Sequence, residues 1–284
     1  MTERRSLGPA YIASIVVAAL MTLVSVAGLA DWDRVYPGVE ASMLALFVGQ
    51  DALNLVVGLP ILVGSMWLAR RGVLIGLLLW PGALFYVLYD YGYYVLGAPF
   101  NAFFLLYIAL TTLSAYALIG IVVSIDGAVV QARLADAVPA RLVGGFLTGI
   151  ALLFAALWSA MSVSALLSGV QLELVPRVVT ILDLTIQLPA LFVGGVLLIR
   201  RHQLGYVVAA GLLLQAAAYL IGLSALTVLT EVLTQAPLDV VAVVPGIFVG
   251  AIGLVFIGMF VRGAAARGRA MHAAGAVRSA AATR

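Results

Sequence analysis

The chain has 284 residues, of which 64% are hydrophobic and only 10% are charged, and its formal net charge is +3. A typical soluble domain is about 45–50% apolar and about 25% charged, so this composition excludes a water-soluble fold. The small positive charge gives no reason to expect a nucleic-acid partner, because the basic residues are spread over many short segments.

Eight apolar stretches follow one another along the chain. They cover residues 10–30, 43–69, 72–94, 102–124, 142–168, 177–199, 203–229 and 241–261. Each is long enough to cross a hydrocarbon core of about 30 Å as a helix, and none has the two-residue alternation of a transmembrane strand. The sequence therefore predicts an all-α, polytopic membrane helix bundle of about eight transmembrane helices, with the lipid bilayer as its partner.

The first stretch has the layout of a secretory signal peptide, since Arg4 and Arg5 precede an apolar run that ends before Asp31. The run is about 20 residues long, whereas the apolar part of a signal peptide has about 7–15. It also has a counterpart in the middle of the chain. We therefore interpret it as a retained first helix.

The arginines indicate how the bundle lies in the membrane. Thirteen of the fifteen fall on one side if the N-terminus is cytoplasmic, and only Arg34 and Arg177 fall outside. Because cytoplasmic loops are enriched in basic residues, we expect both termini in the cytoplasm. The prediction includes an N-terminal cytoplasmic tail at 1–9, a cytoplasmic linker at 125–141 and a basic, disordered cytoplasmic tail at 262–284. Anionic lipid could bind this last tail, although a plain anchoring role is the simpler interpretation.

Two segments about 130 residues apart repeat one pattern. Asn54 precedes Leu59-Pro60 and an arginine pair, and Asp183 precedes Leu188-Pro189 and a second arginine pair. We interpret residues 10–124 and 142–261 as two four-helix repeats. An even number of crossings gives both halves the same orientation, so this 4+4 repeat is parallel, about an axis along the membrane normal.

Polar side chains within the spans are the candidates for a binding site, because such groups are costly in the bilayer. In the second and sixth spans they recur at positions i and i+3, followed by a small or polar residue at i+7, which places them on one helix face. If the repeat axis brings these faces together, they line a shared cavity in the outer half of the bilayer. The candidate ligand-binding or ion-binding residues are Asp51 and Asn54 in the second span, Asp90 in the third, and Thr180, Asp183 and Gln187 in the sixth.

A structural role is the alternative for these residues. Polar side chains in membranes also join helices by hydrogen bonds, at about 0.6 kcal/mol on average, and Asn54 and Gln187 could do no more than that. Asp51 and Asp183 favour a site, because a buried carboxylate needs a partner and, apart from Arg177 at the outer end of the sixth stretch, no arginine lies within the spans. A proton or a bound cation would supply that partner, since burial disfavours the charged form of a carboxyl group.

The tyrosine-rich segment from Phe85 to Tyr94 has two interpretations. Tyrosine and tryptophan gather at membrane interfaces, and together with Trp80 this favours an outer aromatic belt. A stacking platform for a ligand is the alternative.

Several side chains that carry chemistry are missing. The chain has no cysteine and no lysine, which excludes disulfides, thiolate metal sites, cysteine nucleophiles and Schiff bases on lysine. The two histidines, His202 and His272, lie outside the apolar stretches, which excludes ligation of haem or zinc by histidine within the spans. We predict no catalytic residues, no metal site, no cofactor and no enzymatic activity.

Part of the chain resembles a group of uncharacterised bacterial multi-pass membrane proteins. The resemblance covers residues 43–120 and is carried by Gln50-Asp51, Leu59-Pro60, Arg70-Arg71-Gly72, Leu79-Trp80, the segment 86–89 and Gly97-Ala98-Pro99-Phe100-Asn101. It implies a bacterial plasma-membrane location, and it implies no activity and no catalytic residues.

The polar stripes and the repeat favour a module that binds or transports a small solute, a proton or a cation, with its site in the outer half of the bilayer between the repeats. A structural or assembly subunit, whose polar residues only join helices, is the first alternative. A membrane enzyme acting on lipid is the second, and the missing side chains argue against it.

Overall fold

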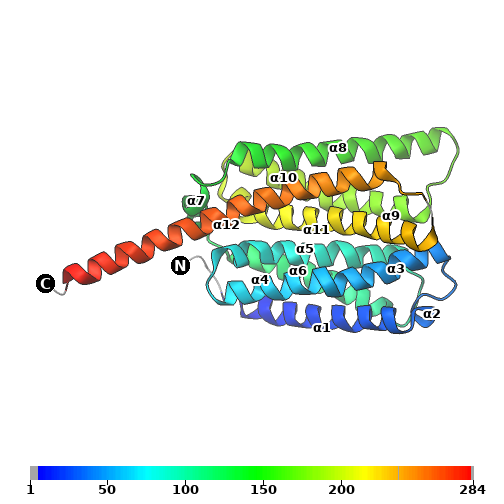
Figure 1. The fold of residues 1–284 in the computed structure, drawn as a ribbon, viewed down its shortest axis with the longest axis horizontal. Helices are drawn as coiled ribbons and strands as arrows, with labels where there is room; N and C mark the ends of the chain where they lie inside the picture. Colours follow the sequence, from blue (N-terminus) through cyan, green and yellow to red (C-terminus); the bar gives the residue numbers. More distant parts are fainter. Residues whose placement is uncertain (1–5, 236, 283–284) are drawn as a thin grey trace.

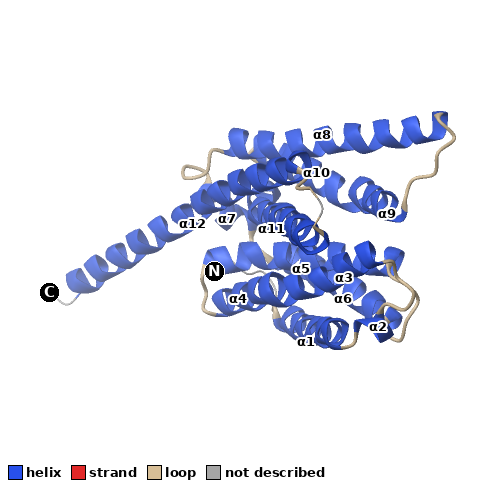
Figure 2. Ribbon diagram, turned by 45° about the vertical axis from the view of Figure 1, so that its right-hand side comes forward, coloured by secondary structure: helices blue, strands red, loops and turns tan. Residues whose placement is uncertain are grey.

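A computed structural model describes residues 6–235 and 237–282 of the chain. Over these residues the fold is helical and contains no strand (Figure 2). The long helices run side by side along one direction (Figure 1), so the predicted all-α bundle is confirmed. Of the predicted tails, residues 1–5 and 283–284 lie outside the described part.

The two halves of the chain form two groups of helices joined by one short helix. The first group consists of α1 (Gly8–Ala30), α2 (Trp32–Val35), α3 (Ala41–Leu53), η1 (Asn54–Gly58), α4 (Leu59–Arg70), α5 (Leu74–Gly97) and α6 (Phe104–Ser124). The joining helix is α7 (Gly127–Leu134), which lies within the predicted linker. The second group consists of α8 (Ala140–Leu167), α9 (Leu174–Leu182), η2 (Asp183–Gln187), α10 (Leu188–Ile199), α11 (Gln203–Thr234) and α12 (Val240–Ala282).

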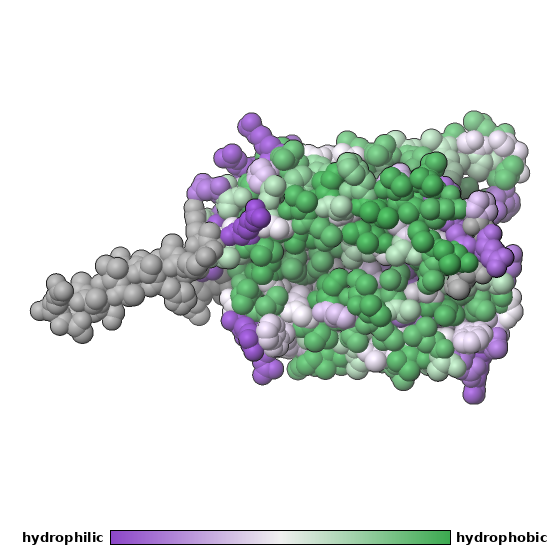
Figure 3. Space-filling view, in the orientation of Figure 1, coloured by the Kyte–Doolittle hydropathy of each residue, from purple (hydrophilic) through white to green (hydrophobic). Residues whose placement is uncertain are grey.

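Eight helical segments of the described chain are long and apolar enough to cross a membrane, which confirms the predicted number. They are Gly8–Ala30, Met43–Arg70, Leu74–Gly97, Phe104–Ser124, Ala140–Leu167, Leu174–Ile199, Gln203–Val232 and Val243–Ala265. The predicted stretches agree with these bounds to within four residues at both ends. On the face drawn in Figure 3, hydrophobic side chains form a belt across the bundle and hydrophilic ones gather at its two ends.

We name the two ends by the predicted orientation. The outer end carries α2 and the loops that join α8 to α9 and α11 to α12, and the inner end carries α7 and the first residues of α1 (Figure 1). At the inner end α12 continues through Ala282 as a helix that leaves the bundle, whereas the sequence predicts a disordered tail from residue 262. The side chains beyond residue 265, with most of the tail arginines, lie outside the described part.

The second and sixth spans are interrupted in the same way. Each changes from α-helix to a five-residue π-helical turn, η1 or η2, and returns to α-helix at a Leu-Pro pair. The N–H of Leu59 donates to the carbonyl of Asn54, five residues back, and that of Leu188 donates to Asp183. Pro60 and Pro189 have no N–H to donate to the carbonyl four residues back. The wider π-helical turn lies directly before each Leu-Pro pair, where that carbonyl would otherwise lack a donor.

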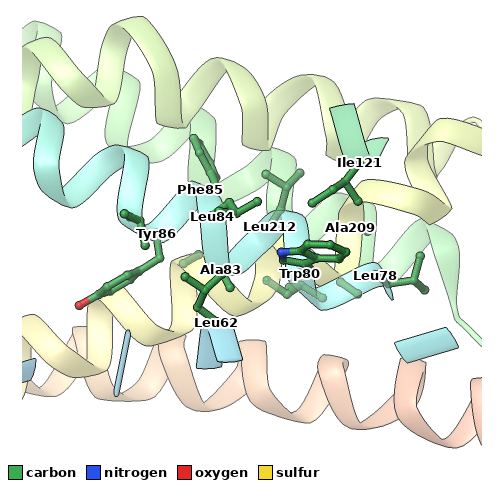
Figure 4. Close-up of a cluster of buried hydrophobic side chains, with 14 of the residues drawn as sticks. Leu62, Leu78, Trp80, Ala83, Leu84, Phe85, Tyr86, Ile121, Ala209 and Leu212 are labelled. Atoms are coloured by element: carbon green, nitrogen blue, oxygen red, sulfur yellow. The ribbon is translucent and has the colours of Figure 1, made fainter. Parts of the chain in front are cut away.

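The third span, α5, is the central helix of the bundle. Trp80, Tyr89, Tyr91 and Tyr94 are all at most 1% exposed, and the apolar side chains around Trp80 come from several helices (Figure 4). The polar ends of the rings have partners inside the protein, since the indole N–H of Trp80 donates to the hydroxyl oxygen of Ser14 at 3.0 Å. The predicted outer aromatic belt is therefore wrong, because α5 faces helices on its sides and not lipid.

The two halves meet where α5 passes α11 (Figure 2). At this crossing Gly82 and Gly211 lie backbone to backbone. A β-carbon at Gly82 would lie 2.6 Å from the carbonyl carbon of Gly211 and would overlap its oxygen, and one at Gly211 would lie 2.8 Å from the nitrogen of Gly82. Only glycine permits so close an approach. Towards the inner end the crossing borders an apolar groove of about 290 Å³ between α5, α6, α10 and α11.

Several glycines occupy equivalent places in the two halves. Gly211 lies 129 residues after Gly82, and Gly205 lies 129 residues after Gly76. A β-carbon at Gly76 would lie 2.7 Å from the carbonyl carbon of Leu68, and one at Gly205 would lie 2.6 Å from that of Leu197. The halves also differ, because α1 packs against both α4 and α6 whereas α8 packs mainly on α10 and is the least buried span. The duplication itself stays a prediction.

Candidate functional site

The polar residues of the second span face into the first half. Asp51 lies in the last turn of α3 and is 1% exposed. One of its carboxylate oxygens accepts a hydrogen bond from the Tyr36 hydroxyl at 2.5 Å, and the other accepts from the Tyr94 hydroxyl at 3.2 Å. A β-carbon at Gly28 would lie 2.9 Å from the Asp51 carboxyl carbon, so a glycine in α1 makes room for this carboxyl group.

Tyr36 lies just outside the spans, after α2, and is buried against Asp51. Burial raises the pKa of the Tyr36 hydroxyl, and the neighbouring Asp51 carboxyl group raises it further. Tyr36 therefore keeps its proton and acts as the donor in this hydrogen bond.

Asn54 is the centre of a second set of hydrogen bonds. It opens the π-helical turn η1 and is fully buried. Its amide nitrogen donates to the Asp90 carboxylate at 2.7 Å, and its amide oxygen accepts from the Tyr86 hydroxyl at 3.0 Å and from Gln50 at 3.4 Å. Asp90 is 1% exposed and Gln50 lies close to its carboxyl group. Every polar atom of the Asn54 side chain is thus used.

Asp183 occupies the same place in η2 that Asn54 occupies in η1. Its carboxylate accepts from the Tyr89 hydroxyl at 2.7 Å and from the indole N–H of Trp158 at 2.6 Å. The Tyr89 ring packs edge-on against Tyr219, with ring centroids 4.6 Å apart. Asp183 therefore joins α8 and α5 through two aromatic side chains.

The remaining predicted residues lie apart from these groups. The hydroxyl of Thr180 is buried and has no hydrogen-bond partner among the described residues. The side-chain oxygen of Gln187 accepts from the amide of Gln215 in α11 at 2.6 Å. The structure thus joins Asn54 to Asp90, and it gives Asp51, Asp183 and Gln187 separate partners.

A cavity of about 270 Å³ lies between the two halves in the outer part of the bundle. The sequence predicts a cavity between the halves that is lined by the two polar stripes. The observed cavity is lined by Leu46, Phe47 and Gln50 of α3, Asp90, Tyr93 and Tyr94 of α5, Trp158 of α8, Val175, Pro176 and Val179 of α9, and Tyr219, Leu223 and Leu226 of α11. Of the six predicted site residues only Asp90 is among them.

Three of the other predicted residues, Asp51, Asn54 and Asp183, lie behind the wall of this cavity and bond to residues that line it. Asp51 accepts from Tyr94, and Asp183 accepts from Trp158, so each aspartate holds one aromatic ring of the wall. Asn54 holds Asp90 in the same way. These three polar side chains therefore hold Tyr94, Trp158 and Asp90 in place, and the lining itself consists of aromatic and aliphatic side chains, Gln50 and the carboxyl group of Asp90.

Sequence reasoning missed most of the lining because it selected polar side chains in the second, third and sixth spans, whereas most of the lining is aromatic or aliphatic. Gln50 lies one turn before Asn54 on the same helix face, which is a signal that could have been used. Tyr93 follows Asp90 by three residues on α5. Trp158 and Tyr219 had no signal in the sequence, because their contribution depends on how α8 and α11 pack.

Replacing Asp183 with alanine is expected to release the Trp158 ring and to lower stability by about 2 kcal/mol, because the buried Tyr89 hydroxyl and the half-buried Trp158 indole N–H lose their acceptor. In a variant whose only tryptophan is Trp158, we expect a red-shifted emission and stronger quenching by acrylamide. Thr185→Val is the matched control, since this lipid-facing hydroxyl on the same turn bonds only to the carbonyl of Ile181. Unchanged Trp158 emission in Asp183→Ala would show that the carboxylate does not position the ring.

The described residues contain no group of three or more histidine, cysteine, aspartate or glutamate side chains that could hold a metal ion. The polar groups at the cavity suit hydrogen bonding and charge pairing with a small molecule. No family model, no curated protein and no solved structure matches this chain.

Proposed function

We propose that this chain binds a small solute in the cavity between its two halves and serves as a binding or transport module in the bacterial plasma membrane. The cavity around the buried Asp90 is the observation that carries the proposal. Its volume of about 270 Å³ lies just below the range of about 300–1,000 Å³ that is usual for small-molecule sites. Its lining, mostly apolar with a few convergent polar groups, is also usual for such sites.

The position of the cavity supports a role that involves both halves. Its lining comes from α3 and α5 of the first half and from α8, α9 and α11 of the second, so a solute bound there would contact both. Substrate sites at the interface between two halves are common in membrane transporters. A protein whose polar residues only join helices would have no need of an open space beside a buried carboxyl group.

Filling the cavity is expected to abolish solute binding without unfolding the protein. Val179→Phe adds bulk from α9 into the space, whereas Val193→Phe adds the same bulk to a half-exposed position of α10 on the apolar groove. The purified protein would be heated with a panel of small solutes, and we expect a saturable rise of the melting temperature in wild type and Val193→Phe but not in Val179→Phe. If no solute raises the melting temperature and all three proteins behave alike, the chain has the structural role instead.

A further inference from the structure

We infer that the ligand of the outer cavity is a small organic cation, bound by the carboxylate of Asp90 and by the aromatic side chains around it. This inference rests on the proposed function and names the chemical class of its ligand. It is carried by the charge of Asp90, by the composition of the wall and by the direction of the polar groups in that wall.

The carboxyl group of Asp90 has no positive partner among the described residues. Its side chain is 1% exposed and lines the cavity, and Asn54 donates to one of its oxygens. It forms no ion pair with any described residue, and the arginines of the described spans lie near the two ends of the bundle. A buried carboxylate needs a positive partner or a proton, and a cationic ligand in the adjoining space would supply the first.

The wall of the cavity suits an organic cation better than a bare proton or a metal ion. Five aromatic side chains surround the space beside Asp90, and aromatic rings attract cations through their electron-rich faces. The aromatic lining residues are Phe47, Tyr93, Tyr94, Trp158 and Tyr219. A proton needs no cavity of this size, and a hard metal ion needs several oxygen ligands, of which this wall offers few.

The polar ends of two rings are already held by groups outside the cavity. The Tyr94 hydroxyl donates to Asp51 and the Trp158 indole N–H donates to Asp183. These rings therefore contribute their apolar carbon surface to the space, and their hydrogen-bonding groups are occupied elsewhere. A sugar or another neutral polar solute would find few free partners, and an anion would be repelled by Asp90, so an ammonium group with small alkyl substituents fits best.

The test compares probes of one shape that differ in charge. The full-length purified protein would be heated with tetramethylammonium, choline and tetraethylammonium, and with the neutral analogue of choline in which a tert-butyl group replaces the trimethylammonium group. We expect at least one cation to raise the melting temperature saturably, and the neutral analogue to bind at least tenfold more weakly than choline. Asp90→Asn is expected to weaken binding of the cation at least tenfold, whereas Asp33→Asn, an exposed acidic residue of the outer end, leaves binding unchanged.

A second variant covers the case in which Asp90→Asn does not fold. Tyr93→Leu removes a half-buried ring of the wall whose hydroxyl forms no hydrogen bond with any described residue. We expect this variant to weaken binding of the cation several-fold and to leave the folded yield unchanged. The inference would be overturned if choline and its neutral analogue bound equally well. It would also be overturned if wild type, Asp90→Asn and Tyr93→Leu bound the cation equally well. Either result would leave the proposed binding of a solute standing. If no cation binds but another solute stabilises wild type and not Val179→Phe, the ligand class is wrong and the proposed function holds. If no solute of any charge binds, both fail.

Discussion

Gly82→Ala is expected to push the two halves of the bundle apart and to cost about 3 kcal/mol or more of stability, at the upper end of what overpacking costs. The added methyl group would overlap the backbone of Gly211, not a side chain that can turn away. Contacts between carbon and a carbonyl oxygen lie at about 3.3–3.6 Å, so α5 and α11 must separate by about 1 Å. Unfolding by a denaturing detergent, followed by circular dichroism, would measure the loss.

Two glycine variants make this prediction sharper. Gly211→Ala should lower stability less than Gly82→Ala does. The nearest atom to its methyl group would be the nitrogen of Gly82, at 2.8 Å, whereas the methyl group at position 82 would overlap the carbonyl oxygen of Gly211. Gly64→Ala in α4 should cost nothing, because a β-carbon there has no neighbour within 4 Å. Equal stability of Gly82→Ala and Gly64→Ala would contradict the close backbone contact between the halves.

The second large effect is expected for Asn54→Leu. The leucine leaves Asp90 without its donor and the Tyr86 hydroxyl without its acceptor. A buried polar group that loses its partner costs about 1–3 kcal/mol, so we expect a loss of about 3 kcal/mol or more in total. The same unfolding measurement would detect it.

Thr111→Val is the control for this variant, since it removes a half-buried hydroxyl that bonds only to the carbonyl of Tyr107 one turn earlier. We expect Thr111→Val to change the free energy of unfolding by less than about 0.5 kcal/mol, because the Tyr107 carbonyl keeps its helical N–H donor. A loss in Asn54→Leu as small as in Thr111→Val would mean that Asp90 and Tyr86 find other partners.

The eight spans could be predicted because each is set by local composition. Long apolar runs between charged residues have one solution in a bilayer, the helix, and the structure follows them closely. The place of each helix in the bundle depends on contacts between distant segments and could not be predicted. For this reason the sequence places the tyrosines of α5 in a lipid-facing belt, although α5 lies at the centre of the bundle.

The same limit applies to the candidate site. The equivalent positions of Asn54 and Asp183 could be predicted from the spacing of each to a Leu-Pro pair, and the structure places both at the start of a π-helical turn. Which way these side chains point could not be predicted, because a π-helical turn adds one residue and rotates the residues before it relative to those after it. Trp158 shows this best, since only the packing of α8 on α10 brings its indole to Asp183.

The contact between Gly82 and Gly211 also has a mechanical consequence. At this crossing the two backbones touch with no side chains between them, although the halves also meet elsewhere through side chains such as Tyr89 and Asp183. The aromatic cavity lies towards the outer end and the apolar groove of about 290 Å³ towards the inner end. Such a contact between backbones is a suitable pivot for a rotation of one half relative to the other. A rocking rotation of one half about it, around an axis in the membrane plane, would narrow one of these spaces as it widened the other, and the glycine backbones would have no side chains to disengage.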